Sequence, residues 1–374
     1  MTAGVVASLT DFRRALVAWY RRHARPLPWR ATRDPYQIWI SEIMLQQTTV
    51  TAVVPYFQRF LARFPTLQDL AAAQEQSVLR LWEGLGYYSR ARNIHKAARL
   101  LVNEHRGEFP REPGELMALP GIGRYTAGAI ASFAFDWPAP IVEANTLRLY
   151  ARLMGLRDDP RSARGQKQLW EFAEQIVPAR HAGEFNQALM ELGARVCVPS
   201  APDCSKCPVR RWCVAATNGW QAEIPLPKPR AAPTEITEVA VAVHRDGKYL
   251  LRKRPEGVRW AGLWDFVRFG WRDAETRSPA LHDVAVEVRR ETGLTVEITA
   301  PLAEIRHSVT RFRITLQCHL GEWLAGEHDH AQGESRWVAS TQFARLPLSV
   351  TGRKLARMIA ARESKSTSAS KRPG

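Results

Sequence analysis

The stretch Leu119-Pro-Gly-Ile-Gly-Arg-Tyr-Thr-Ala-Gly-Ala-Ile130 sets the expected fold of the first half of the chain. Gly121 and Gly123 flank one apolar residue, after Leu-Pro and before a run of small residues, which predicts a tight hairpin between two helices. Glycine tolerates positive φ and lets a ligand approach the main chain closely. The exposed N–H groups of these glycines, beside the start of a helix, would form an anion site suited to a nucleic-acid phosphate. An ordinary turn between helices is the alternative.

The composition is that of a globular protein with a strongly basic charge balance. The chain has 374 residues, 45% hydrophobic and 24% charged, which suffices for two domains with cores of their own. Its net charge is +16 and its pI about 10.1. Lys and Arg outnumber Asp and Glu in both halves, so both halves are expected to face a polyanion, unless the arginine-rich composition serves no partner.

The sequence gives no sign of a membrane or secreted protein. No run approaches the roughly 18 apolar residues of a membrane span. The N-terminus lacks an apolar segment followed by a small-residue cleavage site. We therefore expect a cytoplasmic protein without a membrane partner.

Helical periodicity extends from about Leu9 to Ala215. One buried stripe is formed by apolar residues at helical spacing, namely Tyr36, Trp39, Ile40, Ile43 and Met44. Prolines and glycines interrupt the pattern repeatedly and predict a bundle of many short helices. Residues 224–233 then contain four prolines in ten positions, which predicts a semi-rigid linker.

Beyond this linker the hydrophobic period changes to two. Strand-like alternation occurs at 238–243, 248–252 and 311–316, with helical runs at about 278–292 and after Ser349. The expected fold class is a mostly α N-terminal bundle joined by a Pro-rich linker to an α+β domain. The expected limits are 1–220 for the bundle, 221–235 for the linker, 236–362 for the second domain and 363–374 for a disordered Ser/Lys-rich tail.

Four cysteines close the helical half. Cys197, Cys204, Cys207 and Cys213 have six, two and five residues between them, and four thiolates this close can surround zinc or an iron–sulfur cluster. Four buried thiols without a metal are the alternative. Zinc ribbons usually pair two C-x-x-C knuckles, and this loop has one. The spacing resembles the loop of the endonuclease III superfamily of DNA glycosylases, which implies one [4Fe–4S] cluster. Cys318, on an apolar strand, is expected in the core.

Other stretches resemble the adenine DNA glycosylases of the MutY type. They are Pro28-Trp-Arg30, Pro35-Tyr-Gln-Ile-Trp-Ile-Ser-Glu-Ile-Met-Leu-Gln-Gln-Thr48 and Trp82-Glu-Gly-Leu-Gly-Tyr-Tyr-Ser-Arg90. With the helix-hairpin-helix motif and the cysteine loop, the resemblance runs from about Leu9 to Trp220 and more loosely through the second domain. It implies a base excision repair hydrolase that removes adenine mispaired with 8-oxoguanine. The implied partner is double-stranded DNA carrying that mispair, bound by a monomer in a bacterial-type nucleoid.

Excision of adenine requires a proton on the leaving base and a negative charge near the developing oxocarbenium ion. Glu42 is the candidate acid. It lies among apolar residues of one helix, and a carboxyl against apolar walls can have its pKa raised enough to stay protonated at neutral pH. In the family that this stretch resembles, the matching glutamate protonates adenine N7. A solvated helix glutamate is the alternative.

The second carboxylate is expected at Glu143, in Pro140-Ile-Val-Glu-Ala-Asn-Thr-Leu-Arg-Leu149. The related pattern has aspartate followed by glycine where this chain has Glu143-Ala144. Glutamate keeps the charge, but its extra methylene shifts the carboxylate, and a misplacement of about 1 Å can cost on the order of a hundredfold in rate. Asn145 matches the family's asparagine and is expected to cap the next helix and to hydrogen-bond near the reacting atoms.

Tyr125, inside the hairpin, separates two branches of the superfamily. Relatives that also cut the DNA strand have a lysine at this position, which attacks the sugar and forms a Schiff base. A phenol cannot form that imine. The resemblance therefore predicts a monofunctional glycosylase.

The target base must leave the helical stack before its N7 and C1′ can be reached. By resemblance, Gln47 and Tyr87 enter the DNA near the lesion, with Tyr87 beside the 8-oxoguanine. The residues that match the adenine pocket are Trp29, Arg30 and Gln187, where an arginine and an amide suit the purine edge. For Trp29, and for Tyr88 beside Tyr87, plain core packing is an equal alternative.

The second domain resembles the Nudix-like module that MutY proteins use to inspect 8-oxoguanine. Its segment 286–294 is an eroded Nudix box, with Val286 in place of an arginine and Arg290 in place of an acidic residue. A cation in a magnesium site should abolish metal binding, so we expect recognition without nucleotide hydrolysis. Where the family has Phe-Ser-His, this chain has Val309-Thr310-Arg311. Thr310 keeps a hydroxyl, and Arg311 is placed to grip a phosphate or the lesion's edge.

Two other functions are consistent with parts of the sequence. A mismatch thymine glycosylase shares the hairpin tyrosine, but Gln46-Gln47 with Glu42 and the Nudix-like domain argue against it. A lesion-binding protein with weakened catalysis is suggested by Glu143. The interpretation that fits the motifs best is a monofunctional glycosylase acting on adenine opposite 8-oxoguanine or guanine.

Overall fold

The structure is a computed structural model that describes residues 8–227, 232–271, 280–327 and 333–369. It divides into two compact units. The first unit comprises Met1–Ala73 and Asn93–Pro229, and the second comprises Gln74–Arg92 and Arg230–Gly374. A short helical segment from the first half of the chain thus belongs to the same compact unit as the C-terminal domain.

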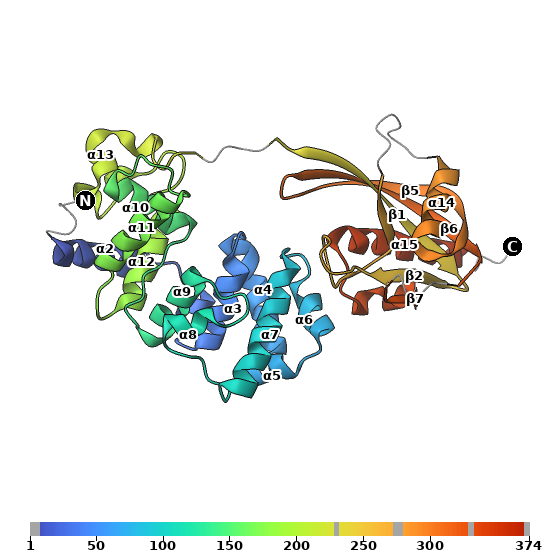
Figure 1. Ribbon diagram of the computed structural model, residues 1–374, viewed down its shortest axis with the longest axis horizontal. Coiled ribbons are helices and arrows are strands. Elements are labelled where there is room, and N and C mark those ends of the chain that lie inside the picture. Colours follow the sequence, from blue (N-terminus) through green and yellow to red (C-terminus); the bar gives the residue numbers. More distant parts are fainter. Residues whose placement is uncertain (1–7, 228–231, 272–279, 328–332, 370–374) are drawn as a thin grey trace. The chain divides into compact units, whose positions relative to one another are not determined.

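The first unit is built from short helices, as the sequence predicts (Figure 1). Its α-helices are α2 (Leu9–His23), α3 (Pro35–Leu45), α4 (Val50–Arg63), α5 (Leu67–Ala72), most of α7 (Tyr88–Glu104), α8 (Pro113–Met117), α9 (Arg124–Phe135), α10 (Ala144–Met154), α11 (Ala163–Ile176), α12 (Ala182–Arg195) and α13 (Val214–Asn218). Single 3-10 turns occur at η1 (Pro28–Arg30), η2 (Cys204–Lys206), η3 (Arg210–Trp212) and η4 (Trp220–Ala222).

Local sequence fixes where the central helix α3 begins. Asp34 caps it by accepting a 2.9 Å hydrogen bond from the backbone N–H of Tyr36, and Pro35 supplies the favoured first helical residue. The helix is buried almost all round rather than along the single predicted stripe. A helix that is apolar on all sides lies inside the domain, so Glu42 in its third turn is enclosed by protein.

Helix α9 packs against both α3 and α12, and α10 packs against α12. Glycines make two of these approaches possible. A Cβ at Gly183 would lie 2.4 Å from the carbonyl oxygen of Ser132, and one at Gly193 would lie 2.8 Å from the Asn145 backbone oxygen. The close packing brings the start of α10, the hairpin before α9 and the middle of α3 around one space. A core of residues from α2, α10, α11 and α12 supports it from behind.

The second unit contains a seven-stranded mixed sheet with the order β3-β2-β1-β6-β5, in which β4 also pairs with β1 and β7 with β2. The β1–β6 pair is parallel, and the other strand pairs are antiparallel. The strands are β1 (Thr234–Arg245), β2 (Lys248–Lys253), β3 (Trp264–Asp265), β4 (Val267–Trp271), β5 (Thr295–Val309), β6 (Phe312–Ala325) and β7 (Ser335–Ala339). The remaining elements are α6 (Glu75–Trp82), the first residues of α7, α14 (Leu281–Thr292), η6 (Ser340–Arg345) and α15 (Val350–Ala369).

The period of two in β1 separates the two cores of this unit. Val239 and Val241 point to the face covered by α14, with Val284 and Val288. Ala240, on the opposite face of β1, belongs to the core that α15 completes. This is the α+β domain that the alternation predicts.

Two segments near the expected domain limits are partly described. Helix α15 continues to Ala369, so residues 364–369 of the expected tail are helical. The linker begins packed on the first unit, where the Ile224 carbonyl accepts a hydrogen bond from Arg152 and Ile224 is buried. Residues 228–231 of the linker and 370–374 of the tail lie outside the described residues.

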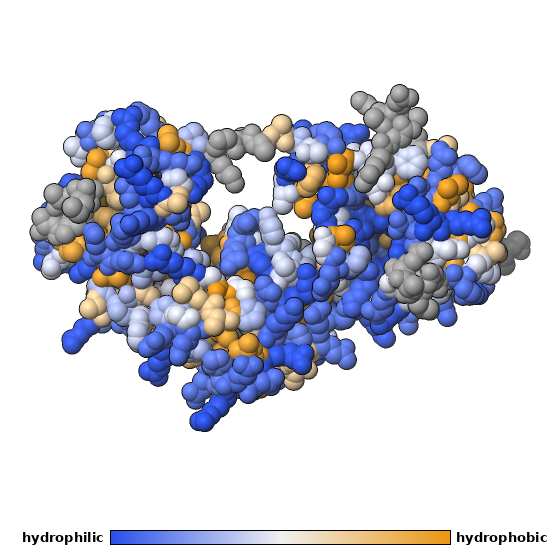
Figure 2. All heavy atoms as spheres, in the orientation of Figure 1, coloured by the Kyte–Doolittle hydropathy of each residue, from blue (hydrophilic) through white to orange (hydrophobic). Residues whose placement is uncertain are grey.

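On the face drawn in Figure 2, hydrophilic residues predominate and apolar residues are scattered among them. Among the described residues, no helix combines the length and apolar character needed to cross a membrane.

Candidate active site

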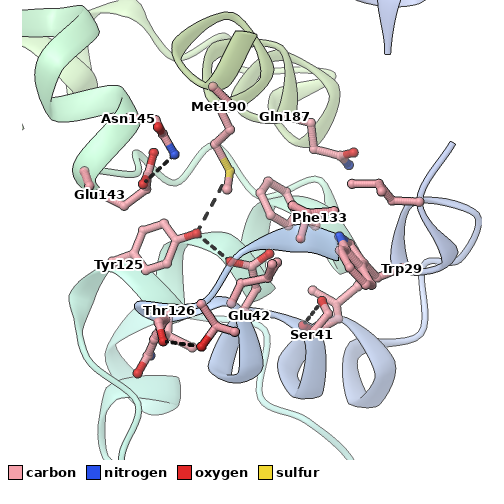
Figure 3. Close-up of a pocket in the computed structure, with 18 of the residues that line it drawn as sticks. Trp29, Ser41, Glu42, Tyr125, Thr126, Phe133, Glu143, Asn145, Gln187 and Met190 are labelled. Carbon is pink, nitrogen blue, oxygen red and sulfur yellow. Dashed lines mark hydrogen bonds between the residues drawn. The ribbon is translucent and has the colours of Figure 1, made fainter. Parts of the chain in front are cut away.

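A cavity of about 1010 Å³ opens in the first unit where α3, α9, α10 and α12 meet. Most of the residues expected to act on the base line it, together with the hairpin residues Gly123 and Arg124. Figure 3 shows Glu42 and Tyr125 pointing toward one another, with Glu143 and Asn145 on one side of the cavity and Trp29 on the other. The structure therefore brings together residues that lie more than a hundred positions apart in the chain.

Glu42 and Tyr125 form the closest polar pair in this cavity. The Tyr125 hydroxyl donates a 2.5 Å hydrogen bond to Oε2 of Glu42, whose residue is 3% exposed. Burial raises the pKa of Glu42 from 4.5 to about 7, the nearby Glu143 charge adds to this, and the Tyr125 hydrogen bond and the charge of Arg30 oppose it. Burial beside Glu42 also raises the pKa of Tyr125 well above its usual range. Near neutral pH a substantial fraction of the Glu42 carboxyl is therefore protonated.

Glu143 caps helix α10. Its Oε1 accepts a 2.9 Å hydrogen bond from the backbone N–H of Thr146, and its own N–H donates to the Thr146 hydroxyl, which completes a capping box. Its Oε2 accepts a 3.2 Å hydrogen bond from Nδ2 of Asn145. Burial raises the pKa of Glu143, while the hydrogen bonds from Asn145 and Thr146 act in the opposite direction. The longer side chain thus reaches the contacts expected of a short capping residue.

The expectation that Asn145 caps this helix is wrong, because Glu143 occupies the cap position. Asn145 instead links Glu143 to Arg148, whose Nη2 donates a 3.0 Å hydrogen bond to Asn145 Oδ1. The same guanidinium donates to the backbone oxygens of Gly193 at 2.7 Å and Cys197 at 2.7 Å. Arg148 was not singled out from the sequence, although it lies one turn after Asn145 on the helix.

The opposite wall of the cavity contains Trp29 and Gln187. Trp29 is 7% exposed and packs edge-on against Phe57 at 5.4 Å between ring centroids. Gln187 Oε1 accepts a 2.8 Å hydrogen bond from the Tyr20 hydroxyl. This leaves the amide nitrogen of Gln187 as the donor available to a ligand.

Arg30 lines the cavity, but its guanidinium is engaged by the protein. Its Nη2 donates a 2.7 Å hydrogen bond to Oε2 of Glu191, a fully buried carboxylate that also accepts from Arg25. Burial opposes ionisation of Glu191, but the hydrogen bonds from Arg25 and Arg30 outweigh it and lower its pKa. Tyr20 and Glu191 were not predicted from the sequence. The four-residue spacing of Gln187 and Glu191 on one helix face was the available signal for Glu191.

The predicted hairpin joins α8 and α9. Gly121 has φ of +78°, whereas Gly123 is extended with φ of −91° and caps α9. Both glycines are exposed, and a Cβ at Gly123 would meet nothing within 4 Å. The main chain at the start of α9 is thus open to a ligand. The sequence predicted that both glycines could adopt positive φ, and only Gly121 does so.

Gln47 and Tyr87 share an unusual backbone conformation. Gln47 has φ of +57° and Tyr87 has φ of +47°, and both side chains are exposed, Tyr87 by 48%. Residues other than glycine are rare in the left-handed region, and such strain concentrates at functional sites. Gln47 lies just after the end of α3 and Tyr87 just before the start of α7, and both side chains are exposed to solvent.

The four cysteines of the predicted metal loop line one small cavity, with Leu149 and Leu153 of α10 behind them. Arg152 places its Nη1 3.3 Å from Sγ of Cys197. Within the described residues, no set of three or more His, Cys, Asp or Glu side chains is arranged to hold a single metal ion. Four thiols around one small cavity are a donor set that either zinc or an iron–sulfur cluster can use.

In the second unit, Thr310 and Arg311 form the turn between β5 and β6. Thr310 has φ of +52°, and both side chains are exposed at the tip of the hairpin. Arg311 lies over the ring of Phe312 at 5.2 Å. In the eroded Nudix box of α14, Arg290 pairs with Glu287 at 2.7 Å and lies 3.7 Å from Glu291. A cation therefore occupies the position between the two remaining carboxylates.

Comparison with known proteins agrees with this architecture. Residues 40–175 match the HhH-GPD superfamily base excision DNA repair protein family, and residues 238–358 match the NUDIX domain family. The solved structure of a thermostable thymine-DNA glycosylase covers 56% of this chain and 97% of that protein, with a TM-score of 0.52 and 31% identity. It extends over little more than half of this chain, a smaller share than the relatives that match by sequence.

Those relatives are adenine DNA glycosylases. The mouse enzyme is 34% identical, with 94% of this chain and 78% of the relative aligned. The human enzyme is 34% identical over 98% of this chain and 77% of its own length, and a Buchnera aphidicola enzyme is 36% identical over 69% and 74%. Because both domains match and these relatives align with most of the sequence, this chain belongs to the adenine DNA glycosylase family of base excision repair, whose members are hydrolases of N-glycosyl bonds.

Proposed function

We propose that this protein removes adenine from DNA where it lies opposite 8-oxoguanine or guanine, by base flipping and acid-catalysed hydrolysis, without cutting the strand. The observation that carries the proposal is the buried Glu42–Tyr125 hydrogen bond at the base of a cavity that also holds a second carboxylate, Glu143. Cleavage of an N-glycosidic bond needs one protonated and one ionised acidic group.

In the proposed reaction, Glu42 donates its proton to N7 of the flipped adenine. The bond between N9 and C1′ then breaks with its electron pair going to the base, which leaves a positive charge on the sugar. The Glu143 carboxylate, oriented by Thr146 and Asn145, stabilises that charge. Water adds to C1′ and releases a proton. Trp29 and the Gln187 amide would hold the purine. Arg30 would contact the purine from the position in which its ion pair with Glu191 holds it.

Tyr125 supports a reaction that stops at base removal. A Schiff base requires an amine at the position that attacks C1′, and the Tyr125 phenol has no such group. The Tyr125 hydroxyl is also occupied by its hydrogen bond to the Glu42 carboxyl. Borohydride treatment during the reaction is expected to trap no protein–DNA adduct.

We infer that DNA is held by several surfaces. The open main chain at Gly123, with the exposed Gly121 before it, would bind a phosphate at the start of α9. Gln47 and Tyr87 would enter the duplex from their exposed, left-handed positions. Thr310 and Arg311 would contact the lesion or its phosphate, while the Arg290 pairs argue against magnesium binding and nucleotide hydrolysis by the Nudix-like domain.

The cysteine loop would hold one [4Fe–4S] cluster through Cys197, Cys204, Cys207 and Cys213. The donor chemistry and the shared cavity of the four thiols fit that cluster. When bound, the cluster would hold the loop in its fold and so place Lys206, Arg210 and Arg211 near DNA phosphates. Purified protein should show the broad visible absorption of thiolate-ligated iron, and stoichiometric zinc would contradict the assignment.

Single-turnover excision tests the proposal directly. Duplexes carrying A opposite 8-oxoguanine, A opposite G and T opposite G are compared with the wild-type chain and with Glu42→Gln. We expect release of adenine from the first two duplexes and a loss of at least about a hundredfold in the variant. Release of thymine would support the thymine glycosylase alternative, and binding without release of any base would support a lesion-binding protein.

A further inference from the structure

The turn that carries Tyr87 is tied to the Nudix-like domain by a shielded ion pair in the second unit. Nε and Nη2 of Arg353, on α15, donate hydrogen bonds of 2.7 and 2.9 Å to the two carboxylate oxygens of Glu83. The side chains are 12% and 10% exposed. Such a bidentate arginine–carboxylate pair fixes orientation as well as distance.

Arg353 is itself held in place on its other side. Its Nη1 donates to the Phe343 carbonyl at 2.6 Å, and its Nη2 donates to the Leu346 carbonyl at 2.6 Å. The guanidinium therefore joins η6, the following loop and the segment 74–92 in one network. A lysine has a single charged nitrogen and cannot make this set of contacts.

Other contacts run along the same segment. Trp264 Nε1 donates a 3.2 Å hydrogen bond to Gln76, and Arg80 Nε donates one of 2.9 Å to the Ala344 carbonyl. Arg92 donates to the Ala261 carbonyl. The whole of α6 and the start of α7 thus lie against the Nudix-like domain within this unit.

Glu83 opens a short turn that ends at Tyr87. Within that turn, Trp82 Nε1 donates a 3.1 Å hydrogen bond to the Gly86 carbonyl, and Arg90 Nη2 donates one of 3.1 Å to the Leu85 carbonyl. The Arg90 guanidinium lies 5.3 Å from the Tyr87 ring centroid. The turn is therefore stiff, so a displacement at Glu83 would be transmitted to the exposed ring of Tyr87.

We propose that Arg353 is a positioning residue for lesion recognition. Through its ion pair with Glu83 it fixes the position of the Tyr87 turn relative to the Nudix-like domain within the second unit. The preference for 8-oxoguanine over guanine therefore depends on this ion pair. The inference rests on the proposed function, in which Tyr87 reads the base opposite adenine. The contacts of the Arg353 guanidinium are with Glu83 and with the carbonyls of Phe343 and Leu346, so its assigned role is positioning.

The test compares full-length variants in equilibrium binding and in excision. Binding is measured in a Glu42→Gln background, where the base stays attached, with duplexes carrying 8-oxoguanine or guanine opposite adenine. Arg353→Met is expected to lower the ratio of the two affinities by about tenfold, within the range of coupling between contacting residues. Arg357→Met, an exposed residue one turn later on α15, removes the same charge and should leave the ratio unchanged.

A second comparison separates positioning from general stability. Glu83→Gln with Arg353→Met leaves no buried charge unpaired, so it is expected to be more stable than Arg353→Met alone, and it should show the same loss of preference. Combining Arg353→Met with Tyr87→Ala should add little to the effect of Tyr87→Ala alone. An unchanged preference in the double charge variant, or independent effects of Arg353 and Tyr87, would overturn the proposal.

The outcome for the proposed function is read separately, from the wild-type chain. If it releases no adenine from either duplex, the proposed glycosylase activity fails. The affinity ratio for 8-oxoguanine against guanine still decides whether Arg353 controls lesion preference. If adenine is released with a preference that Arg353→Met retains, the positioning role fails and the activity stands.

Discussion

The Tyr125 hydroxyl donates a 2.5 Å hydrogen bond to the carboxyl of Glu42, a residue that is only 3% exposed. Two opposing effects set the pKa of this carboxyl. Burial raises the pKa of Glu42 to about 7, and the hydrogen bond from Tyr125 lowers it. Tyr125 therefore sets the pH above which the acid loses its proton, in addition to excluding a lyase amine from this position.

Replacing Tyr125 by phenylalanine is expected to move the descending limb of the pH–rate profile to higher pH. The variant loses the interaction that lowers the pKa of Glu42, so the carboxyl stays protonated further into the alkaline range. The rate at low pH should fall by less than about tenfold because Glu42 still supplies the proton. Single-turnover excision between pH 5 and pH 9 measures both effects.

Tyr20→Phe is the matched control, since it removes a phenol that bonds the cavity residue Gln187 rather than Glu42. Its descending limb should coincide with that of the wild type. A limb that moves to lower pH in Tyr125→Phe would contradict the assigned role of the hydrogen bond.

Glu42→Gln is expected to stabilise the protein at alkaline pH. The folded-state pKa of about 7 lies above the ordinary 4.5, so the stability that Glu42 contributes is fully present below about pH 4.5 and is lost as pH rises through 7. The loss amounts to about 2–3 kcal/mol between pH 5 and 8, and glutamine does not titrate. The melting temperature of Glu42→Gln relative to wild type should therefore rise by about 5–10 °C between these pH values.

The control for this measurement is Glu112→Gln, which removes an exposed carboxylate that makes no capping hydrogen bond. Its melting temperature should differ from that of the wild type by the same amount at both pH values. An equally constant difference for Glu42→Gln would mean that the Glu42 carboxyl is solvated.

The sequence predicts most of the fold because its signals are local. Helical periodicity, the hairpin glycines and the period of two in 238–243 each specify one element from neighbouring residues. The full burial of α3 was not predictable, since which faces of a helix are covered depends on partners such as α9, far along the chain. The end of α15 was also missed, because polar Ser and Lys residues fit a helix terminus as well as an irregular tail.

The candidate site was predicted through motifs, and its supporting contacts were not. Glu42, Tyr125 and Glu143 come from stretches that resemble one family, whereas the Tyr20 and Glu191 contacts join α2 or its following loop to α12. Such pairs lie more than 160 residues apart, and the residues around Tyr20 do not indicate its partner. The capping role of Glu143 was misassigned to Asn145, because asparagine is the commoner cap and glutamate is not among the favoured types.

Glu143→Gln should abolish most activity, whereas Glu143→Asp should preserve it. Glutamine keeps the size but removes the charge that faces the developing cation, and a loss of about a hundredfold is expected. Aspartate keeps the charge and is a favoured helix cap, so its carboxylate can accept from Thr146 and Asn145 in the same cap. Its single-turnover rate should remain within about tenfold of the wild type.

Circular dichroism and thermal melting of both Glu143 variants check that α10 is retained. Full activity in Glu143→Gln would remove Glu143 from the reaction. A rate in Glu143→Asp far above that of the wild type would show that the glutamate carboxylate is held in the wrong place.

Gly193→Ala is expected to reduce excision although it replaces no residue that acts on the base. A methyl group at this position would lie 2.8 Å from both Cβ and the backbone oxygen of Asn145, so the start of α10 must move. Glu143 caps that helix end, and a shift of about 1 Å in its carboxylate would cost on the order of a hundredfold in rate. Overpacking should lower the free energy of unfolding by about 1–3 kcal/mol. Gly114→Ala, in the exposed helix α8 where a Cβ meets nothing within 4 Å, should leave rate and stability nearly unchanged. A Gly193→Ala enzyme that melts earlier yet excises adenine at the wild-type rate would show that the position of the α10 terminus does not govern the reaction.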